Sequence, residues 1–240
     1  MRRLILTHLI ILLSLTALGQ SLNTIYFLPG QGSDERIFDS LNFDPSFKLE
    51  HIKYPTPEKG TNLKQYAKII STQIDTGENF ILVGVSFGGM ISSELIEILN
   101  PEKVLIISSA KNRTELPFRY KFQKSIPLYK IMPGKVLLFG AKLLQPIVEP
   151  DRDYDKETFK SMLGDKDPKY MKRTIDMIIT WERMSNSDNI VHIHGDNDHT
   201  LPIRKVNPNY IIPQGSHMMT LTRAEEISQI LNKEIEGMKE

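Results

Sequence analysis

The chain has 240 residues, of which 40% are hydrophobic and 25% charged, an ordinary composition for a globular protein. Its formal net charge is +1, which gives no electrostatic reason to expect binding to nucleic acid. It contains no cysteine, so disulfides, thiolate metal sites and cysteine nucleophiles are excluded.

The first residues resemble a secretory signal. Arg2 and Arg3 precede an apolar stretch over residues 4–18, and Ala17 and Gly19 have the small-x-small spacing of a signal-peptidase site. We expect residues 1–19 to be removed and the mature protein to begin near Gln20, in the periplasm or outside the cell. The alternative is an uncleaved membrane anchor, although the stretch is short for a span of about 20 apolar residues.

Strands and helices alternate over the next part of the chain. Short apolar runs predict strands at residues 24–28, 80–85 and 104–107, and alternation of polar and apolar residues predicts a strand at residues 48–53. Helical spacing predicts a helix over residues 63–74. Nearly all-apolar strands that alternate with helices indicate a parallel sheet covered on both faces.

This alternation stops between residues 111 and 185, where helical patterns separated by prolines predict a helical cap insertion. Strands resume at residues 190–194 and 210–212, followed by a last helix that carries apolar residues from Leu221 to Ile235 on one face. We therefore expect an α/β core formed by residues 20–110 and 186–240.

The first part of the expected cap is basic. Between Lys111 and Lys142 there are eight Lys or Arg residues, and Glu115 is the one acid. One interpretation is a peripheral contact with anionic lipid or with an acidic substrate. The pattern favours the alternative, a solvated helix face.

The central feature is the stretch over residues 80–100. An apolar strand ends in Gly84-Val85-Ser86-Phe87-Gly88, and a helical pattern follows from Met90 with Ile98 on its buried face and Pro101 at its end. A strand, a tight turn and a helix form the context that a nucleophilic serine in G-x-S-x-G requires. The alternative is an ordinary glycine-rich turn between a strand and a helix.

Two later loops also follow strands. The first contains Asp196 and Asp198 ahead of Pro202, and the second contains His217 after Gly215 and Ser216. In parallel sheets the carboxyl ends of strands share one edge, so these side chains are expected near Ser86. The order along the chain is Ser, Asp, His.

These three motifs together resemble the signatures of the α/β-hydrolase fold superfamily. The resemblance spans the mature chain and implies a mostly parallel sheet of about six strands, with helices on both faces and a helical cap. It also implies that Ser86 is the nucleophile and His217 the general base. Counting from Gly195 to Pro202, the family pattern selects Asp198 as the acid and leaves Asp196 as a turn residue.

The resemblance further implies an oxyanion hole formed by the backbone N–H groups of Phe87 and Gln31. The chain has Pro29-Gly30-Gln31 where the family commonly has His-Gly-x, which weakens any assignment to a subfamily. The family's usual leading antiparallel hairpin is also missing, because Thr24 follows the expected signal so closely.

The implied function is hydrolysis of an ester-type small molecule through an acyl-enzyme on Ser86, with no metal or cofactor. Alternatives are a thioesterase, an acyltransferase or a C–C hydrolase with the same triad, or a non-catalytic binding module of the same fold. A substrate pocket under the cap is expected to be apolar, from residues that could equally pack the cap onto the sheet: Met132, Phe139, Phe159, Met162, Met171, Met177 and Trp181.

A metal site is the other alternative, because residues 192–199 loosely resemble the His-x-His-x-Asp-His zinc motif of metallo-β-lactamase-like hydrolases. The spacing differs by two residues, and among possible downstream ligands we find His217 alone. His192 and His194 lie in a predicted strand, so we expect both to be packed rather than to bind metal.

Overall fold

The computed structural model describes residues 23–185, 187 and 189–236. The expected signal over residues 1–19 lies outside the described residues, so its cleavage and the export of the protein stay predictions. Among the helices of the described residues, none combines the length and the apolar character needed to cross a bilayer.

In the described part of the chain, six strands form one parallel sheet in the order β2-β1-β3-β4-β5-β6. They are β1 (Thr24–Leu28), β2 (Lys48–His51), β3 (Phe80–Val85), β4 (Lys103–Ile107), β5 (Ile190–Gly195) and β6 (Tyr210–Ile212). In the central register, Val83 of β3 lies opposite Phe27 of β1 and Leu105 of β4. This sheet confirms the predicted fold class.

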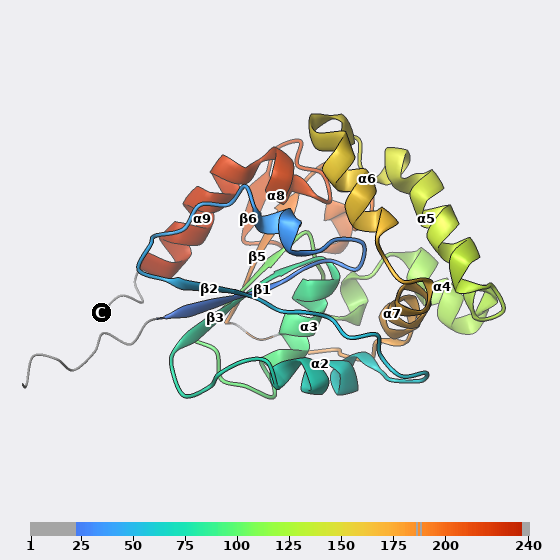
Figure 1. Cartoon of the computed structure of the whole chain (residues 1–240), viewed down its shortest axis with the longest axis horizontal. Helices are drawn as coiled ribbons and strands as arrows, with labels where there is room; N and C mark the ends of the chain where they lie inside the picture. The colour runs from blue at the N-terminus through green and yellow to red at the C-terminus, as the bar shows by residue number, and fades with distance from the viewer. Residues whose placement is uncertain (1–22, 186, 188, 237–240) are drawn as a thin grey trace, which may run out of the picture.

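Helices cover both faces of the sheet, because successive strand residues point to opposite sides. Leu82 packs in the core layer of α2 (Leu63–Ser71) and α3 (Phe87–Leu95), whereas Val83 packs in the layer of α9 (Ala224–Glu236). Figure 1 shows α2 and α3 on one face, with α8 (Met219–Thr222) and α9 on the other.

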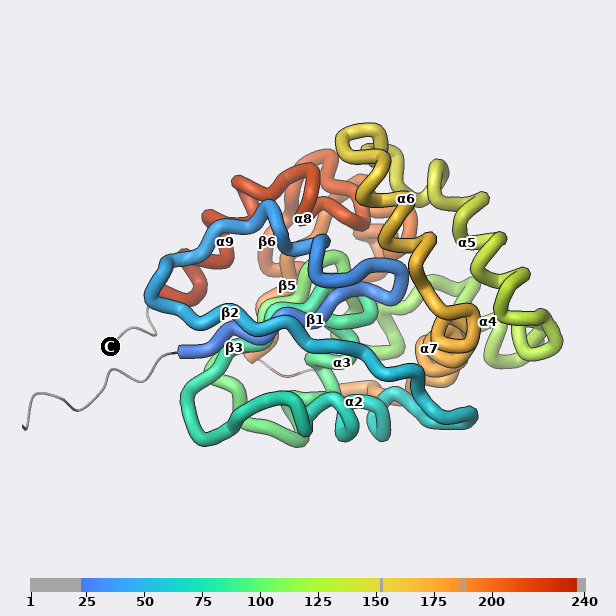
Figure 2. Tube along the Cα trace, viewed as in Figure 1, coloured from blue at the N-terminus to red at the C-terminus, as the bar shows by residue number. Residues whose placement is uncertain are grey.

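The segment between β4 and β5 is helical, with no strand among its described residues. Its helices are α4 (Phe118–Ser125), α5 (Gly134–Val148), α6 (Lys156–Gly164) and α7 (Pro168–Thr180). Figure 2 traces this segment from the sheet to a group of helices at one end of the molecule and back again. Met177 and Ile178 of α7 pack in the same core layer as Leu82, so α7 anchors the cap. The division into core and cap at residues 111 and 185 stays an interpretation.

The helix after Ser86 is shorter than predicted at its far end. It begins at Phe87 and ends at Leu95, before Pro101. The N–H groups of Glu97 and Ile98 bond to carbonyls three residues earlier, which tightens the chain out of the helix. Ile98, predicted on the buried face, is therefore 37% exposed.

Other boundaries also differ from the prediction, and α2 ends at Ser71 rather than at residue 74. Strand β2 ends at His51, because the side-chain amide of Gln73 pairs with both the N–H and the C=O of Lys53 in place of a neighbouring strand. The last helical segment is interrupted at Arg223, which separates α8 from α9.

Candidate active site

Ser86 occupies a strained turn between β3 and α3. Its φ of 52° lies in the left-handed region that residues other than glycine rarely adopt. Its N–H donates to the carbonyl of Ile107 at 2.9 Å, and its own carbonyl accepts from Oγ of Ser109 at 2.6 Å. These two bonds to β4 and the loop after it hold the serine in place.

The two glycines of the motif allow this turn because neighbouring backbone fills the space where a side chain would lie. A Cβ on Gly84 would lie 2.6 Å from backbone atoms of Gly88 and Gly89. A Cβ on Gly88 would overlap the carbonyl of Leu28 at the end of β1. The motif therefore brings α3 against two strands at once.

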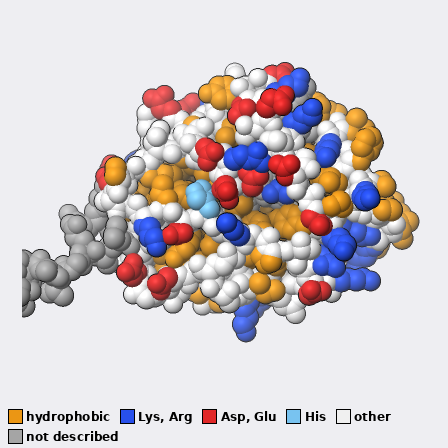
Figure 3. Space-filling model, in the orientation of Figure 1, with side chains coloured by type: hydrophobic (Ala, Val, Ile, Leu, Met, Phe, Trp, Pro, Cys, Tyr) orange, Lys and Arg blue, Asp and Glu red, His pale blue; other side chains and the backbone are white. Residues whose placement is uncertain are grey.

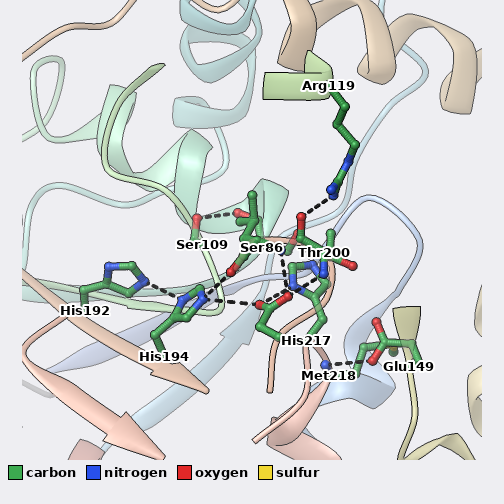
Figure 4. Close-up of polar contacts among 11 residues, drawn as sticks. Ser86, Ser109, Arg119, Glu149, His192, His194, Thr200, His217 and Met218 are labelled. Carbon is green, nitrogen blue, oxygen red and sulfur yellow. Dashed lines mark hydrogen bonds and ion pairs between the residues drawn. The ribbon is translucent and has the colours of Figure 1, made fainter. Parts of the chain in front are cut away.

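The structure brings together the three side chains predicted to form the triad. Oγ of Ser86 lies 2.8 Å from Nε2 of His217, and Nδ1 of His217 lies 2.7 Å from Oδ2 of Asp198. Figure 4 shows this chain of polar contacts at the edge of the sheet. Because a carboxylate only accepts, Nδ1 of His217 carries the proton, and Nε2 is free to accept from Ser86.

Asp198 is buried, and both of its carboxylate oxygens accept hydrogen bonds. Its Oδ1 accepts the N–H groups of Thr200 and Leu201 at 2.8 and 2.7 Å. Burial alone would raise the pKa of Asp198, but the charge and hydrogen bond of His217, with smaller contributions from His194 and Leu201, hold it below its ordinary value. The side chain is therefore a carboxylate at neutral pH.

Asp196 lies in a different environment. Its carboxylate accepts the N–H of Gln214 at 2.6 Å, an exposed bond that joins the two loops. This is the turn role that the sequence indicated for it.

His217 carries a perturbed pKa. Burial alone would lower the pKa, but the charge and hydrogen bond of Asp198, followed by the charge of Glu149, hold it above its ordinary value. A histidine in this state is well suited to take a proton from Ser86 and to keep it while negative charge develops nearby.

Both residues predicted to form the oxyanion hole border Ser86. Phe87 is the first residue of α3, where backbone N–H groups have no partner within the helix. The loop of Gln31 passes close by, since a Cβ on Gly30 would lie 3.4 Å from Cβ of Ser86. The side chain of Gln31 donates to Oγ1 of Thr174 at 2.7 Å and so ties this loop to α7. The oxyanion role itself stays a prediction.

His192 and His194 are buried, as expected, and they contact each other. Nε2 of His192 lies 3.0 Å from Nδ1 of His194, whose Nε2 lies 2.7 Å from the carbonyl of Leu201. In the described part of the chain, no group of three or more His, Cys, Asp or Glu side chains is arranged to hold a metal ion.

A pocket of about 440 Å³ opens in front of Ser86. Its lining is largely apolar and comes from both the core and the cap, for example Ile37, Val85, Met90, Ala141, Leu144 and Val148. Of the cap residues proposed from the sequence to line it, Met171 does so. Phe139 is 68% exposed, and four others pack in the hydrophobic core, which agrees with the alternative that these residues pack the cap onto the sheet: Phe159, Met162, Met177 and Trp181.

Two charged residues that the sequence interpretation missed lie at this pocket. Glu149 follows α5, is 4% exposed, and accepts the N–H of Met218 at 3.2 Å. Arg119 of α4 donates to the carbonyl of Thr200, beside the triad acid. Both reach the site only through the packing of the cap, and their positions in the sequence carry no motif.

Comparison with known proteins supports the fold. No protein-family model matches the chain, and the search of curated proteins gave no match. Among solved structures, a thermophilic esterase from Thermogutta terrifontis has 10% identity and a TM-score of 0.68, with 91% of each chain covered. MenH from S. aureus has 12% identity and a TM-score of 0.67, with 93% of this chain and 97% of that chain covered.

A lipase-esterase related protein from Clostridium acetobutylicum ATCC 824 is also similar. It has 17% identity and a TM-score of 0.61, with 88% of this chain and 93% of that chain covered. All three are proteins of the α/β-hydrolase fold. The chain therefore has the α/β-hydrolase fold, as the three sequence motifs implied.

Proposed function

We propose that the protein is a serine hydrolase that cleaves an ester-type substrate through an acyl-enzyme on Ser86. The observation that carries this proposal is the hydrogen-bonded chain from Ser86 through His217 to Asp198, at the base of a largely apolar pocket. In this chain Nδ1 of His217 faces Asp198, which leaves Nε2 to accept the proton of Ser86.

In the proposed first step, Nε2 of His217 removes the proton of Ser86 as Oγ attacks the carbonyl carbon of the substrate. The negative charge that develops on the carbonyl oxygen meets the N–H groups of Phe87 and Gln31. His217 then gives its proton to the departing alcohol, and the acyl group stays on Ser86. Water, activated by the same histidine, releases the acid and restores the serine.

The apolar lining of the pocket supports an acyl group with an apolar chain. Structural neighbours with the same fold include an N-acyl homoserine lactone degrading enzyme and an enol-lactonase, each so named in its own description. A thioester, a transfer to another alcohol or a C–C substrate would use the same triad, and these remain the alternatives to ester hydrolysis.

The test is covalent labelling of the serine. The wild-type protein should react with a fluorophosphonate probe and hydrolyse p-nitrophenyl esters, and Ser86→Ala should lose both. Ser71→Ala is a matched control, since it changes a serine of α2 whose hydroxyl donates to the carbonyl of Lys68. Esters of graded acyl length would define the substrate class. A folded wild type with neither labelling nor turnover would favour the binding-module alternative.

Export is proposed from the sequence of residues 1–19 alone. Mass spectrometry of the protein from its own host should show a mature N-terminus near Gln20. An intact Met1 on a soluble cytosolic protein would contradict the proposal.

A further inference from the structure

The cap carries most of the large apolar side chains that are exposed in the described residues. They lie on α4, on the chain that follows it, and on α5. Figure 3 shows hydrophobic and basic side chains gathered along the end of the molecule where Figure 1 places these helices. We call this surface the outer cap face, formed by Phe118, Phe122, Ile126, Leu128, Ile131, Val136, Phe139, Leu143 and Ile147.

Helix α5 is apolar on two opposite sides. One side lines the pocket through Ala141, Leu144 and Val148, together with the polar Gln145. The other presents a stripe spaced by three and four residues, in which Val136, Phe139, Leu143 and Ile147 are 46%, 68%, 67% and 64% exposed. A helix that is apolar on two opposite sides is usually buried on both. In the described part of the chain, the rest of the protein covers only the pocket side of α5.

The chain around α4 extends the same surface. Phe118 and Phe122, one helical turn apart, are 70% and 45% exposed, and their rings lie 5.9 Å apart. Ile131, between α4 and α5, is 82% exposed. These exposed aromatic and aliphatic side chains, together with those of α5, form one extended apolar patch rather than isolated surface residues.

The charge of the same segment selects the kind of partner. Between Lys111 and Lys142 the one acid, Glu115, is buried beside Lys111. The exposed Lys and Arg residues of this segment are Arg119, Lys124, Lys130, Lys135 and Lys142. Lys135 and Lys142 of α5 are both exposed beside the apolar stripe. Two copies of such a basic face would repel each other. Anionic lipid headgroups would instead attract the basic side chains, and the apolar side chains could be buried at the boundary between headgroups and acyl chains.

We propose that the outer cap face docks onto a membrane surface that contains anionic lipid. The exposed side chains of α5 enter the boundary between headgroups and acyl chains, and the lysines contact the headgroups. This surface is independent of the chemistry at Ser86, so the binding experiments below require no turnover.

A fluorophore placed on α5 gives a local readout. The chain has no cysteine, so Leu143→Cys offers a single labelling position for an environment-sensitive dye. With vesicles of phosphatidylcholine and phosphatidylglycerol, the emission of this label should shift to the blue. With phosphatidylcholine alone, the shift should be smaller. The matched control is Ile69→Cys, a 45% exposed position on α2. This helix covers one face of the sheet and is not part of the outer cap face (Figure 1).

Binding is then measured by co-sedimentation with the same vesicles, with every variant prepared with the same N-terminus as the wild type. The double change Phe139→Glu and Leu143→Glu should lower the affinity at least about tenfold. Ile69→Glu should leave it unchanged. Replacing Lys135 and Lys142 by Glu should weaken binding more than replacing Lys64 and Lys68, two exposed lysines of α2.

Three results would overturn the proposal. The label at position 143 could remain unshifted with anionic vesicles, or labels at positions 143 and 69 could shift equally. The protein could instead form a dimer in buffer without vesicles that the Phe139→Glu and Leu143→Glu changes disperse. That last result would assign the outer cap face to a second copy of the chain.

Discussion

Nε2 of His194 lies 3.5 Å from Oδ2 of Asp198, the same oxygen that faces Nδ1 of His217. Both side chains are buried at this contact. Asp198 therefore has one histidine on the side of the nucleophile and a second histidine behind it, and the second has no part in the proton transfers proposed above.

The hydrogen-bond partners fix the protonation of this second histidine. A carbonyl only accepts, so Nε2 of His194 carries a proton and donates it to Leu201, while Asp198 lies 3.5 Å from the same nitrogen. Nδ1 of the neutral ring then accepts from Nε2 of His192. Burial, ahead of other causes, lowers the pKa of both rings, so both are neutral at pH 7.

We predict that His194 positions Asp198 and its loop. His194→Gln, whose amide can still donate to Leu201, should retain most of the turnover of the wild type. His194→Leu removes the donor and should lower kcat by about tenfold to a hundredfold, since a small misplacement of a catalytic group has effects of this size. The measurement is kcat and KM for one ester with both variants. Equal activity in the two variants would contradict the positioning role.

The sequence predicted the parts of the site that depend on local constraints. Ser86 was found because a nucleophilic serine at the end of a strand requires glycines two residues before and after it, and this whole motif spans five residues. Asp198 and His217 followed from the same logic, since each lies in a loop directly after a strand. The geometry agrees with the expected arrangement of these three side chains, and their catalytic roles await the experiments proposed here.

The cap could not be predicted to the same depth. Met162 and Phe139 both lie in amphipathic helices, yet Met162 is fully buried and Phe139 is 68% exposed. Helical spacing indicates which residues share a face, but not which face the rest of the chain will cover. Glu149 was missed for the same reason, because it reaches the site only once α5 has packed.

The triad acid is tested by two matched aspartates in one loop. Asp198→Asn should lower turnover on the order of 10⁴-fold, by analogy with the general Ser-His-Asp template. Asp196→Asn should retain most of the activity, because its carboxylate bonds to the exposed N–H of Gln214 and does not contact His217 in the hydrogen bonds described. Circular dichroism of both variants controls for folding. The opposite ranking would transfer the role to Asp196.

The pH dependence of turnover should report His217. Only the neutral ring accepts the proton of Ser86, so kcat/KM should fall as the pH drops through the pKa of His217, which lies above its ordinary value of 6.5. In Asp198→Asn the negative charge that raises this pKa is gone, so the midpoint of the residual activity should move to lower pH. An unchanged midpoint would show that another group controls the fall of kcat/KM at low pH.

The close approach at the serine turn predicts opposite effects for two glycine substitutions. In Gly88→Ala the new Cβ would overlap the carbonyl of Leu28, so the variant should lose several kcal/mol of unfolding free energy or fail to fold. Gly140→Ala lies within α5, where the new Cβ meets no atom within 4 Å beyond its chain neighbours and the nearby helix backbone. It should gain about 0.5–1 kcal/mol. Urea unfolding of both variants measures the difference, and an equally stable Gly88→Ala would show that the turn can open.

Glu149 is a buried acid beside the triad that the proposed mechanism does not use. Burial, as the largest cause, raises its pKa to about 8 from an ordinary value of 4.5. The charges that face it are those of His217, which lowers this pKa, and of Asp198 and Asp151, which raise it. The N–H of Met218 stabilises the ionised form and so opposes the increase.

This pKa predicts how stability changes with pH. Between pH 4.5 and about 8 the folded protein holds a proton on Glu149 that the unfolded chain has already released, so stability falls as the pH rises through this window. At about 1.4 kcal/mol per pKa unit, the loss has an upper limit of about 5 kcal/mol. Glu149→Gln keeps an acceptor for Met218 but cannot ionise, so it should escape the loss.

The variant and wild type should therefore have similar melting temperatures at pH 4.5, and the variant should melt several degrees higher at pH 8.5. Glu157→Gln on α6 is the matched control, because its side chain is exposed on the same cap. Its melting temperature should follow the wild type across the whole range. If the difference between Glu149→Gln and wild type did not grow with pH, then Glu149 would already be ionised in the folded protein. Its buried position beside the triad would then require a cation or a rearranged cap to accommodate the charge.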